Sequence, residues 1–592
     1  MGFGSRAGLV SAATFAAAAL IAAPAHAATY TVTRFDDPAP PGACDPDCSL
    51  REAVIAANGA SGPDAIRLPG GTYTLSIAQP SGPSGDLDIN DSVTMATVGP
   101  GDAVIDANGA VTGDRGLEVH SGSTFLFGVG VVNGVAPADG DGVHRGGGIR
   151  VDADGRLAMH GGEVGRNSVP EAAGEGGGIH NAGLVELLSG LGAAEAGSAG
   201  IVDFGGVLVD GNTVGGAGGL GGGIFTAQSA TTVVEGSKLS SNQAPFGGAI
   251  FDLGAPSAGG SQIFRSLLTH NSAAAGGAVF EGTGGSITLH NATIEGSTAD
   301  IAGGAVRTRG GTVLLKNSTV SSNAAGKEGG GIATRDGAGG EPASVTLHNT
   351  IVAANTDADD GAHPDCFDVT GGRFHSGGYN IIGIGDGCGL QPAAGDQIGT
   401  AASPVDPGLA PSTRFAGGLQ PTWPIQPTSN AVDAGDPSPG GCEPEDARGV
   451  PRSLGGRCDI GAYELTRCQG VLVNRVGSKL KDASTSQRPP LVTPTAAADG
   501  LLGLGGNDDL AGDAGDDGLC GGDGGDTLRG SVGGDILAGG ADDDVVNGGG
   551  GPDRLLGGSG GDRLAGGPGF DVCKGGLGHD IATGCEVKRG IP

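Results

Sequence analysis

Apolar residues recur at every ninth position near the C-terminal end of the chain, and glycine-rich segments separate them. Residues 503–583 repeat the pattern G-G-x-G-x-D-x-U-x nine times in phase, with an apolar residue at U. Glycine allows the tight turns, and a short strand at x-U-x would return the chain with its apolar side chain inward. Each nonapeptide therefore predicts half a coil of a parallel β-roll in which alternate repeats stack.

A longer period predicts coils of a parallel β-helix between about residues 116 and 365. Glycine-rich turns precede a β-branched residue at Ile149, Ile179, Ile224, Ile250, Val279, Val306 and Ile332. The steps between these residues are 26 to 30 positions, except for one step of 45 that holds an insertion near residues 187–205. A period in the high twenties is typical of one three-sided coil. The Gly, Thr and Val content excludes leucine-rich and helical repeats.

Other positions keep the same period. The stretches 287–294, 313–320 and 345–352 align and alternate apolar with polar residues, which predicts strands with one face toward the core. Asn291, Asn317 and Asn349 fall where these strands bend, and we expect their amides to form a hydrogen-bonded ladder from coil to coil. A second series is expected to do the same before the glycine turns: Asn167, Asn212, Asn242, Asn271 and Asn323.

A solenoid exposes its apolar core at both ends and needs caps. Ser49 and Glu52 form a capping box that predicts a short helix ending near Asn58. Its apolar face would carry Leu50, Val54 and Ile55. Residues 65–68 and 72–75 are predicted to form the first strand, so the helix lies just before the first coil, where a cap belongs.

Two segments resemble known families. Residues 48–53, Cys-Ser-Leu-Arg-Glu-Ala, resemble the CSLREA motif that opens many secreted bacterial β-helix proteins, and residues 430–435, 446–449 and 458–464 resemble the closing segment of the choice-of-anchor Q family. Together they bracket residues 44–465 and imply a right-handed parallel β-helix, but no particular chemistry. That family often ends in an anchoring tail, whereas here a polar linker, residues 481–500, leads into the nine-residue repeats.

The sixth position of the nine-residue repeat is always aspartate. The nine residues are Asp508, Asp517, Asp526, Asp535, Asp544, Asp553, Asp562, Asp571 and Asp580. Stacking would line up their carboxylates beside convergent carbonyl oxygens, an all-oxygen environment that suits Ca²⁺. We therefore predict these nine aspartates as metal ligands and calcium as the cofactor.

The repeat resembles the RTX, or haemolysin-type, calcium-binding repeat family. Residues 503–583 hold fifteen Asp and four basic residues, a formal charge of −11, and only one aliphatic core residue per repeat. Mutual repulsion would oppose folding without cations. A disordered acidic linker is the alternative that composition favours, and it is the state expected without calcium.

Composition supports a solenoid and limits the partners. The chain has 592 residues, including 125 glycines and one tryptophan, and only 3% are aromatic, which argues against an ordinary globular core. The net charge of −33 argues against nucleic acid and anionic membranes as partners and is compatible with divalent cations.

Residues 1–27 predict a secretory signal peptide, because Arg6 precedes an apolar run, Leu9 to Ala23, and a small-x-small cleavage site before Ala28. A membrane anchor is the alternative, although the run is short and rich in alanine. We expect the mature protein to be secreted, extracellular or cell-surface associated, without a stable membrane span.

Ten cysteines follow the predicted signal, as expected in an oxidising compartment. The sequence leaves their connectivity open, and a pairing of near neighbours is Cys44–Cys48, Cys366–Cys388, Cys442–Cys458 and Cys573–Cys585, which leaves Cys468 with Cys520. Zinc is the competing interpretation, but neither paired C-x-x-C motifs nor well-spaced histidines support it.

The predicted organisation is all-β. It comprises a signal peptide (1–27), an N-terminal cap with the first coils (28–115), central β-helix coils (116–365), C-terminal coils with a closing segment (366–465), a linker (466–502) and a calcium-binding β-roll (503–585).

Parallel β-helices also host enzymes, and the sequence offers candidate catalytic residues. His290, Lys316 and His348 recur on consecutive coils; Arg307, Arg309 and Arg335 lie one face away, with Asp300 and Asp336 nearby. A uronan lyase needs a base and a cation or arginine, which these types could supply. The simpler interpretation is a solvated strand face, and aromatic sugar platforms are scarce, so we predict no catalytic residue.

We predict a secreted calcium-binding structural or adhesive protein of the bacterial surface or matrix, with polysaccharide or cell-surface components as candidate partners. The alternative is a polysaccharide lyase or hydrolase on a β-helix of the pectate-lyase type.

Overall fold

The computed structural model describes most of the chain after residue 27. The described residues are 28–38, 43–77, 85–171, 173–193, 201–204, 206–255, 260–359, 361–371, 373–410, 422–452, 457–473, 475–476 and 498–591. The predicted signal peptide and residues 477–497 of the predicted linker lie outside them.

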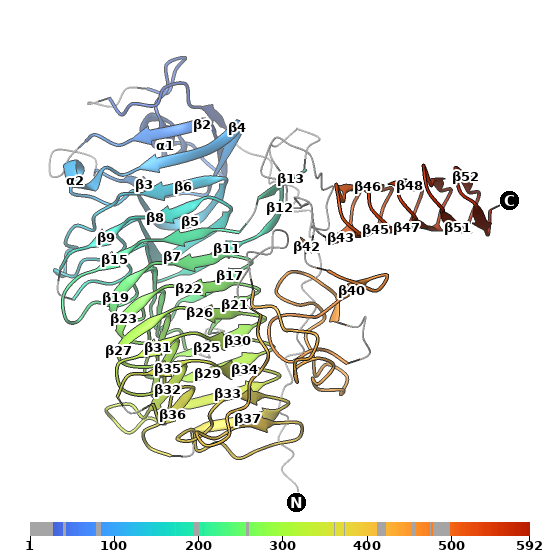
Figure 1. Cartoon of the computed structure of the whole chain (residues 1–592). Coiled ribbons are helices and arrows are strands. Elements are labelled where there is room, and N and C mark those ends of the chain that lie inside the picture. The colour runs from blue at the N-terminus through green and yellow to red at the C-terminus, as the bar shows by residue number, and fades with distance from the viewer. Residues whose placement is uncertain are drawn as a thin grey trace, which may run out of the picture.

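Parallel strands stack into a β-helix, which forms the long body of the molecule in Figure 1. Each full coil contributes strands to three rows, and the middle coils add a short fourth row. The first row contains β3 (Leu87–Ile89), β5 (Leu117–Phe127), β7 (Ile149–His160), β10 (Ile179–Asn181), β16 (Ile224–Thr226), β20 (Ile250–Asp252), β24 (Val279–Glu281), β28 (Val306–Arg309), β32 (Ile332–Arg335) and β36 (Cys366–Asp368).

The second row contains β1 (Thr29–Thr31), β2 (Asp64–Thr74), β4 (Val93–Asp106), the later parts of β5 and β7, β11 (Leu184–Leu188), β17 (Thr231–Glu235), β21 (Ser261–Phe264), β25 (Ser286–His290), β29 (Thr312–Lys316), β33 (Ser344–His348) and β37 (Phe374–Gly378). The 45-residue step holds an antiparallel hairpin, β12 (Gly190–Ala193) with β13 (Ile201–Phe204).

The third row contains the later parts of β2 and β4, then β6 (Val129–Val132), β8 (Glu163–Gly165), β14 (Leu208–Asp210), β18 (Lys238–Ser240), β22 (Leu267–Thr269), β26 (Thr293–Glu295), β30 (Thr319–Ser321), β34 (Ile351–Ala353), β38 (Ile381–Ile382) and β39 (Gln397–Ile398). The fourth row contains β9 (Ser168–Val169), β15 (Thr213–Val214), β19 (Gln243–Phe246), β23 (Ser272–Ala275), β27 (Thr298–Ala302), β31 (Ala324–Ala325) and β35 (Thr356–Asp357).

The predicted β-helix register is confirmed. The β-branched residues that follow the glycine turns stack on one another along the first row, for example Ile224 on Ile250 and Ile250 on Val279. Ile287, Val313 and Val345 stack in the second row, as the aligned stretches predicted. These side chains belong to one continuous buried core that runs the length of the coils.

One of the two predicted asparagine ladders is present. The amide of Asn167 donates to Asn212, that of Asn212 to Asn242 and that of Asn242 to Asn271, at 2.9 to 3.1 Å. Ser297 takes the place of an asparagine in the next coil and connects to Asn323. The column then continues through Asn355 to Asp365, which the sequence analysis did not include.

The other asparagine series does not form a ladder. Asn291, Asn317 and Asn349 adopt φ of 52°, 47° and 48°, the left-handed conformation that asparagine tolerates at a corner. Their side chains bind the closing segment instead: the amide of Asn291 donates to the Glu445 carbonyl and that of Asn349 to the Gly441 carbonyl.

The N-terminal cap forms as the capping box predicts. Helix α1 (Leu50–Gly59) starts with reciprocal hydrogen bonds between Ser49 and Glu52 and covers the first coils. Leu50 and Val54 are buried, but Ile55 is 43% exposed, so the predicted apolar face is narrower than expected. A one-turn helix, α2 (Gly109–Thr112), follows at a corner. Neither described helix has the length and apolar composition needed to cross a bilayer.

The described residues between 399 and 476, which include the predicted closing motifs and are called the closing segment from here on, run back along the side of the lower coils (Figure 1). It holds the antiparallel pair β40 (Arg467–Cys468) and β41 (Val471–Leu472). Ile425, Ile460 and Tyr463 pack with Ile351 and Ile381 of the third row in a separate apolar cluster. The segment therefore completes the β-helix by covering the corner between its second and third rows.

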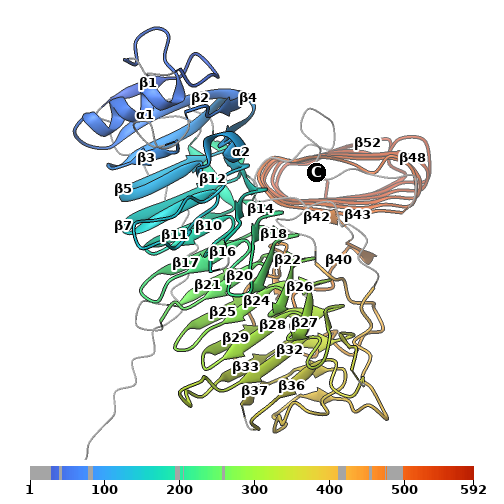
Figure 2. The same ribbon diagram turned by 90° about the vertical axis from the view of Figure 1, so that its left-hand side faces the viewer.

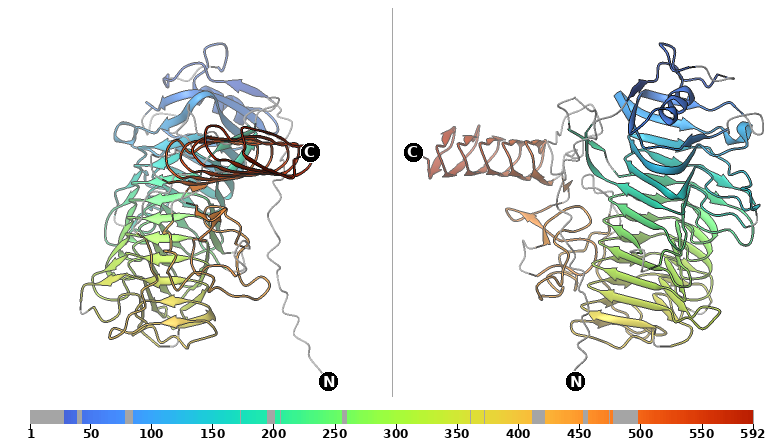
Figure 3. Two further views of the ribbon diagram at one scale, coloured as in Figure 1. Left: turned by 45° about the vertical axis from the view of Figure 1, so that its right-hand side comes forward. Right: turned by 180° about the vertical axis from the view of Figure 1, so that it is seen from behind.

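The nine-residue repeats form the predicted β-roll, a flattened coil seen nearly end-on in Figure 2 and from the side in the right-hand view of Figure 3. Its strands pair in parallel with those 18 residues away, so alternate repeats stack. One sheet contains β42 (Arg475–Val476), β43 (Gly500–Gly505), β45 (Gly518–Asp523), β47 (Ile536–Ala541), β49 (Arg554–Ser559), β51 (Val572–Leu577) and β53 (Val587–Arg589); the other contains β44 (Asp509–Ala511), β46 (Thr527–Val532), β48 (Val545–Gly550), β50 (Arg563–Ala565) and β52 (Ile581–Thr583).

All ten cysteines form disulfides, and the five pairs are those predicted: Cys44–Cys48, Cys366–Cys388, Cys442–Cys458, Cys468–Cys520 and Cys573–Cys585. The Cys468–Cys520 bond joins the closing segment to the roll. Val450, Val473 and Val476 pack beside it against Leu502 and Leu504.

Candidate metal centre

The nine predicted aspartates occupy equivalent buried places in the roll. Each side chain is at most 5% exposed and precedes a strand whose apolar residue enters the core. In the eight aspartates from Asp517 to Asp580, Oδ1 accepts a backbone N–H from the aspartate two repeats earlier: Oδ1 of Asp544, for example, accepts the backbone N–H of Asp526 at 2.8 Å. This bond fixes the orientation of each carboxylate.

The second carboxylate oxygen points the other way and lacks a hydrogen-bond partner. Oδ2 is buried and unpartnered in Asp517, Asp526, Asp535, Asp544, Asp553, Asp562, Asp571 and Asp580. A buried anionic oxygen without a donor is costly, and coordination to a cation is one of the few arrangements that satisfy it.

The first glycine of each repeat makes room for this oxygen. A Cβ added at Gly521 would lie 1.9 Å from Oδ2 of Asp526, and one added at Gly548 would lie 2.3 Å from Oδ2 of Asp553. The backbone carbonyl of Gly539 also lies close to Gly521, so a carboxylate and main-chain oxygens converge there. The donor set is oxygen only and fits a hard cation such as Ca²⁺.

Burial raises the pKa of six of these carboxylates, those of Asp517, Asp526, Asp535, Asp544, Asp553 and Asp562. Desolvation raises the pKa of Asp526 and Asp535 to about 6 and that of Asp544 to about 7, and neighbouring carboxylates add to the shift. For Asp544 these neighbours are Asp526 and Asp562 on the same edge of the roll, together with Asp542. A bound cation would reverse this balance, because it favours the ionised form.

Sequence reasoning missed one member of this series. Asp499 is nine residues before Asp508, is buried, and donates its backbone N–H to Oδ1 of Asp517 at 2.7 Å. Leu501 likewise joins the row of core leucines. The glycines of the motif are missing before Asp499, but the spacing of nine could have revealed it.

The histidines and lysine that the sequence offered as catalytic candidates form ion pairs with the closing segment. His290, Lys316 and His348 stack in register on the second row, as predicted. Glu443 lies 3.1 Å from His290 Nδ1 and 2.9 Å from Lys316 Nζ, and Asp436 lies 3.0 Å from His348 Nε2. Burial opposes the ionisation of Glu443, but these two partners outweigh it and lower its pKa to about 2. The cluster therefore anchors the closing segment.

The arginine candidates lie elsewhere. Arg307, Arg309 and Arg335 belong to the first row, on β28 and β32, and do not join the histidines of the second row. Asp336 pairs with Arg373 at 2.7 Å, and Asp300 lies on β27 of the fourth row. The residues proposed as one lyase-like set are therefore divided among three faces.

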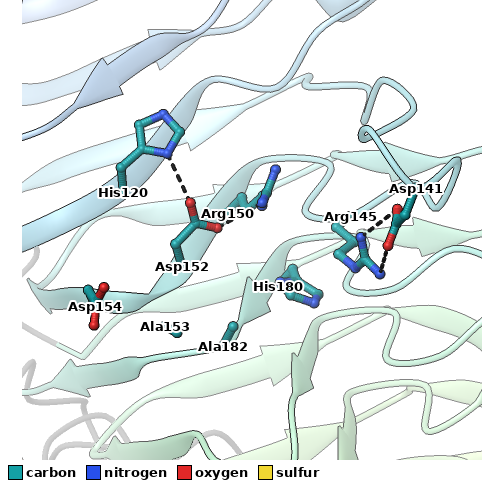
Figure 4. A pocket seen from close by; sticks show the side chains of 9 residues that line it. All are labelled: His120, Asp141, Arg145, Arg150, Asp152, Ala153, Asp154, His180 and Ala182. Atoms are coloured by element: carbon teal, nitrogen blue, oxygen red, sulfur yellow. Dashed lines mark hydrogen bonds and ion pairs between the residues drawn. The ribbon is translucent and has the colours of Figure 1, made fainter.

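A polar hollow lies over the first row near the N-terminal coils (Figure 4). His120 binds Asp152 at 2.9 Å, and Asp152 also pairs with Arg150. Burial opposes the protonation of His120, but the surrounding carboxylates outweigh it and raise its pKa. His120 also lies near Asp88 and Glu118, yet Arg150 already pairs with Glu118 at 2.9 Å. The sequence analysis missed this group. Asp88 and Glu118 occupy equivalent positions in successive coils, and this equivalence could have indicated it.

Comparison with known proteins agrees with the assignment of the roll. The RTX calcium-binding nonapeptide repeat (4 copies) matches residues 521–555 and 556–584. Such repeats bind Ca²⁺.

Among solved structures, the chain is similar to pectate lyase Pel9A, with 12% identity and a TM-score of 0.37 over 75% of this chain and 98% of that one. It is also similar to the PL6 family alginate lyase AlyGC, with 10% identity and a TM-score of 0.24 over 91% of this chain and 78% of that one. No curated protein matches the sequence.

Proposed function

We propose that this chain is a secreted calcium-binding structural or adhesive protein of the bacterial surface or matrix. The roll binds calcium, and the β-helix to which it is attached serves as a rigid support. Polysaccharide or cell-surface components are the partners that such a role requires. Five disulfides and the small apolar core of the roll suit a protein that works outside the cell.

One observation carries the calcium part of the proposal: the unpartnered Oδ2 atoms, each facing a glycine that leaves room for it. Asp508, Asp517, Asp526, Asp535, Asp544, Asp553, Asp562, Asp571 and Asp580 would hold the ions together with main-chain oxygens of the glycine turns. The protein supplies fixed, desolvated carboxylates, and calcium supplies the charge that makes their burial favourable.

The non-catalytic part rests on the fate of the candidate cluster. The side chains of His290, Lys316 and His348 hold the closing segment through Glu443 and Asp436. A histidine or lysine that is paired with a carboxylate of the closing segment is not available as a base to abstract a substrate proton. The lyase or hydrolase alternative therefore lacks the set of groups that the sequence suggested for it, because the arginines lie on a different row from His290, Lys316 and His348.

The test uses the full chain purified from culture medium, with an N-terminus at Ala28 expected. Circular dichroism in chelator should show less β-structure than in millimolar calcium, and the change should saturate. Asp526→Asn, Asp544→Asn and Asp562→Asn combined should raise the calcium midpoint at least tenfold. Spectra that are identical with and without calcium would contradict the proposal.

A parallel screen addresses the enzyme alternative. Pectate, alginate, hyaluronan and neutral glycans are incubated with the calcium-loaded protein and assayed for new reducing ends and unsaturated products. We expect none. Turnover that His290→Ala or Lys316→Ala abolishes while the closing segment stays in place would establish an enzyme instead.

A further inference from the structure

The outward-facing positions of the first row form a continuous column along the β-helix. Side chains alternate along each strand, so the second residue of each first-row strand points away from the core. Strand register stacks these residues from coil to coil in the order Asp88, Glu118, Arg150, His180, Phe225, Phe251, Phe280, Arg307 and Ala333. The rings from His180 to Phe280 are stacked, with centroids 5.1 to 5.8 Å apart.

Arg307 follows this aromatic stack and is almost as buried as the rings, at 8% exposure. Its guanidinium makes no hydrogen bond or ion pair with any residue that the structure describes, and Nη1 is buried without a partner. A guanidinium offers five N–H donors, and leaving them unsatisfied away from water is costly. The other deeply buried arginines differ: Arg51, Arg115, Arg448 and Arg452 each pair with a carboxylate.

Two further arginines lie beside Arg307 on the same surface. Arg309 is two residues along β28 and points to the same side, and Arg335 lies directly opposite Arg309 on β32. Like charges in directly opposite positions of neighbouring strands repel. Burial, together with Arg335 and Arg309, lowers the pKa of Arg307 to about 10, while Glu328 opposes this shift without forming an ion pair.

This basic cluster stands in a chain with 65 acidic and 32 basic residues. Acidic side chains are abundant, yet none of those described pairs with these three arginines. We propose that Arg307, Arg309 and Arg335 form a binding site for an oxyanion, a carboxylate, sulfate or phosphate group, that belongs to a ligand from outside the chain.

The chemistry of the three side chains fits such a ligand. Guanidinium groups present parallel N–H donors that match the oxygen spacing of carboxylate and sulfate, and these charge-assisted bonds are among the strongest in proteins. Arg307 would gain most, because the anion would supply a partner to a guanidinium whose Nη1 is buried without one. Arg309 and Arg335 are exposed and would close on the ligand from the solvent side.

The test measures sulfate binding to the full calcium-loaded chain by isothermal titration calorimetry and by thermal shift, with sodium chloride holding ionic strength constant. Wild-type protein should bind saturably and gain thermal stability. Arg309→Gln with Arg335→Gln, which leaves the buried arginine in place, should weaken sulfate binding at least tenfold. Arg307→Lys keeps the charge but loses the parallel N–H donors of the guanidinium, so it should also weaken sulfate binding.

Arg156→Gln is the matched control, because Arg156 already pairs with Glu186 at 2.6 Å on the second row. It should bind sulfate like wild type. All variants should keep the calcium-dependent dichroism of the roll, so the oxyanion site and the calcium function can fail separately. Absence of saturable sulfate binding, or equal binding in the double variant, would overturn the proposal.

A second arm separates two sources of the anion. Oligogalacturonate and a heparin hexasaccharide are titrated under the same conditions. Binding at least tenfold tighter than sulfate, and lost in the double variant, would assign the site to acidic saccharide chains. Binding no tighter than sulfate would assign it to a small free anion.

Discussion

Two glycines of one repeat provide a sharp test of the calcium site. Gly548 and Gly550 lie in the same nonapeptide, and neither has a positive φ, so alanine can adopt both backbone conformations. A Cβ at position 548 would meet Oδ2 of Asp553 at 2.3 Å, whereas a Cβ at position 550 would meet only the Ser531 carbonyl at 3.9 Å. The two substitutions therefore add the same methyl group with and without a clash.

Gly548→Ala should displace the Asp553 carboxylate from the position in which it can bind calcium. Overpacking of this kind costs about 1 to 3 kcal/mol. An increase of 1.4 kcal/mol corresponds to about tenfold in an equilibrium constant, so the calcium midpoint should rise several-fold to about a hundredfold. Gly550→Ala should be neutral, or should stabilise by about 0.5 kcal/mol because it restricts the unfolded chain.

The assay follows far-UV circular dichroism of the full chain during calcium titration. Asp553→Asn is a second control, since it removes the ligand charge without adding volume, and it should raise the midpoint as Gly548→Ala does. Equal midpoints for the two alanine variants would refute the assignment of the Oδ2 side of the carboxylate as the calcium-binding side.

The remaining predictions concern pH, the closing segment and the asparagine ladder. The pKa of Asp544 is raised to about 7 from an ordinary value near 4, so without calcium the folded roll binds more protons than the unfolded chain. The stability of the calcium-free roll should therefore fall as pH rises from about 4 to about 7. Calcium affinity should rise over the upper part of that range, and calcium titrations at pH 5.5, 6.5 and 7.5 would measure the change. Glu443→Gln removes a partly exposed charge that binds His290 and Lys316, so the free energy of unfolding should fall by about 1 kcal/mol and proteolysis within the closing segment should become faster. The control Glu341→Gln, in an exposed turn, should change neither the free energy of unfolding nor the rate of proteolysis. Asn242→Ala leaves buried partners in two neighbouring coils unsatisfied and should cost about 3 kcal/mol in thermal or chemical denaturation, against less than about 0.5 kcal/mol for the exposed neighbour Gln243→Ala.

Periodicity explains what the sequence could predict. Ile224, Ile250 and Val279 stack because each coil repeats the spacing of the one before, and Asp526 and Asp544 align for the same reason. Such positions are fixed by neighbours one coil away, and the repeat itself records that relation.

Contacts outside the period could not be predicted in the same way. Asn291 was expected to bind Asn317, but its amide binds Glu445, 154 residues further along the chain. The closing segment has no repeat, so its route over the corner is set by packing and by pairs such as Glu443 with Lys316. The lack of a carboxylate partner for Arg307 among the described residues could not be predicted from the sequence either, because it depends on which acidic side chains lie near Arg307 in the fold.

The register of the coils makes the length of the β-helix adjustable. Removal of residues 224–249 would join Gly223 to Ile250, bring Asn212 opposite Asn271, and leave the closing segment's contacts with Lys316 and His348 untouched. The molecule would shorten by one strand spacing, about 4.8 Å, with its caps unchanged. Duplication or loss of the gene segment for a whole coil can therefore change the distance between the N-terminal cap and the closing end by one strand spacing at a time.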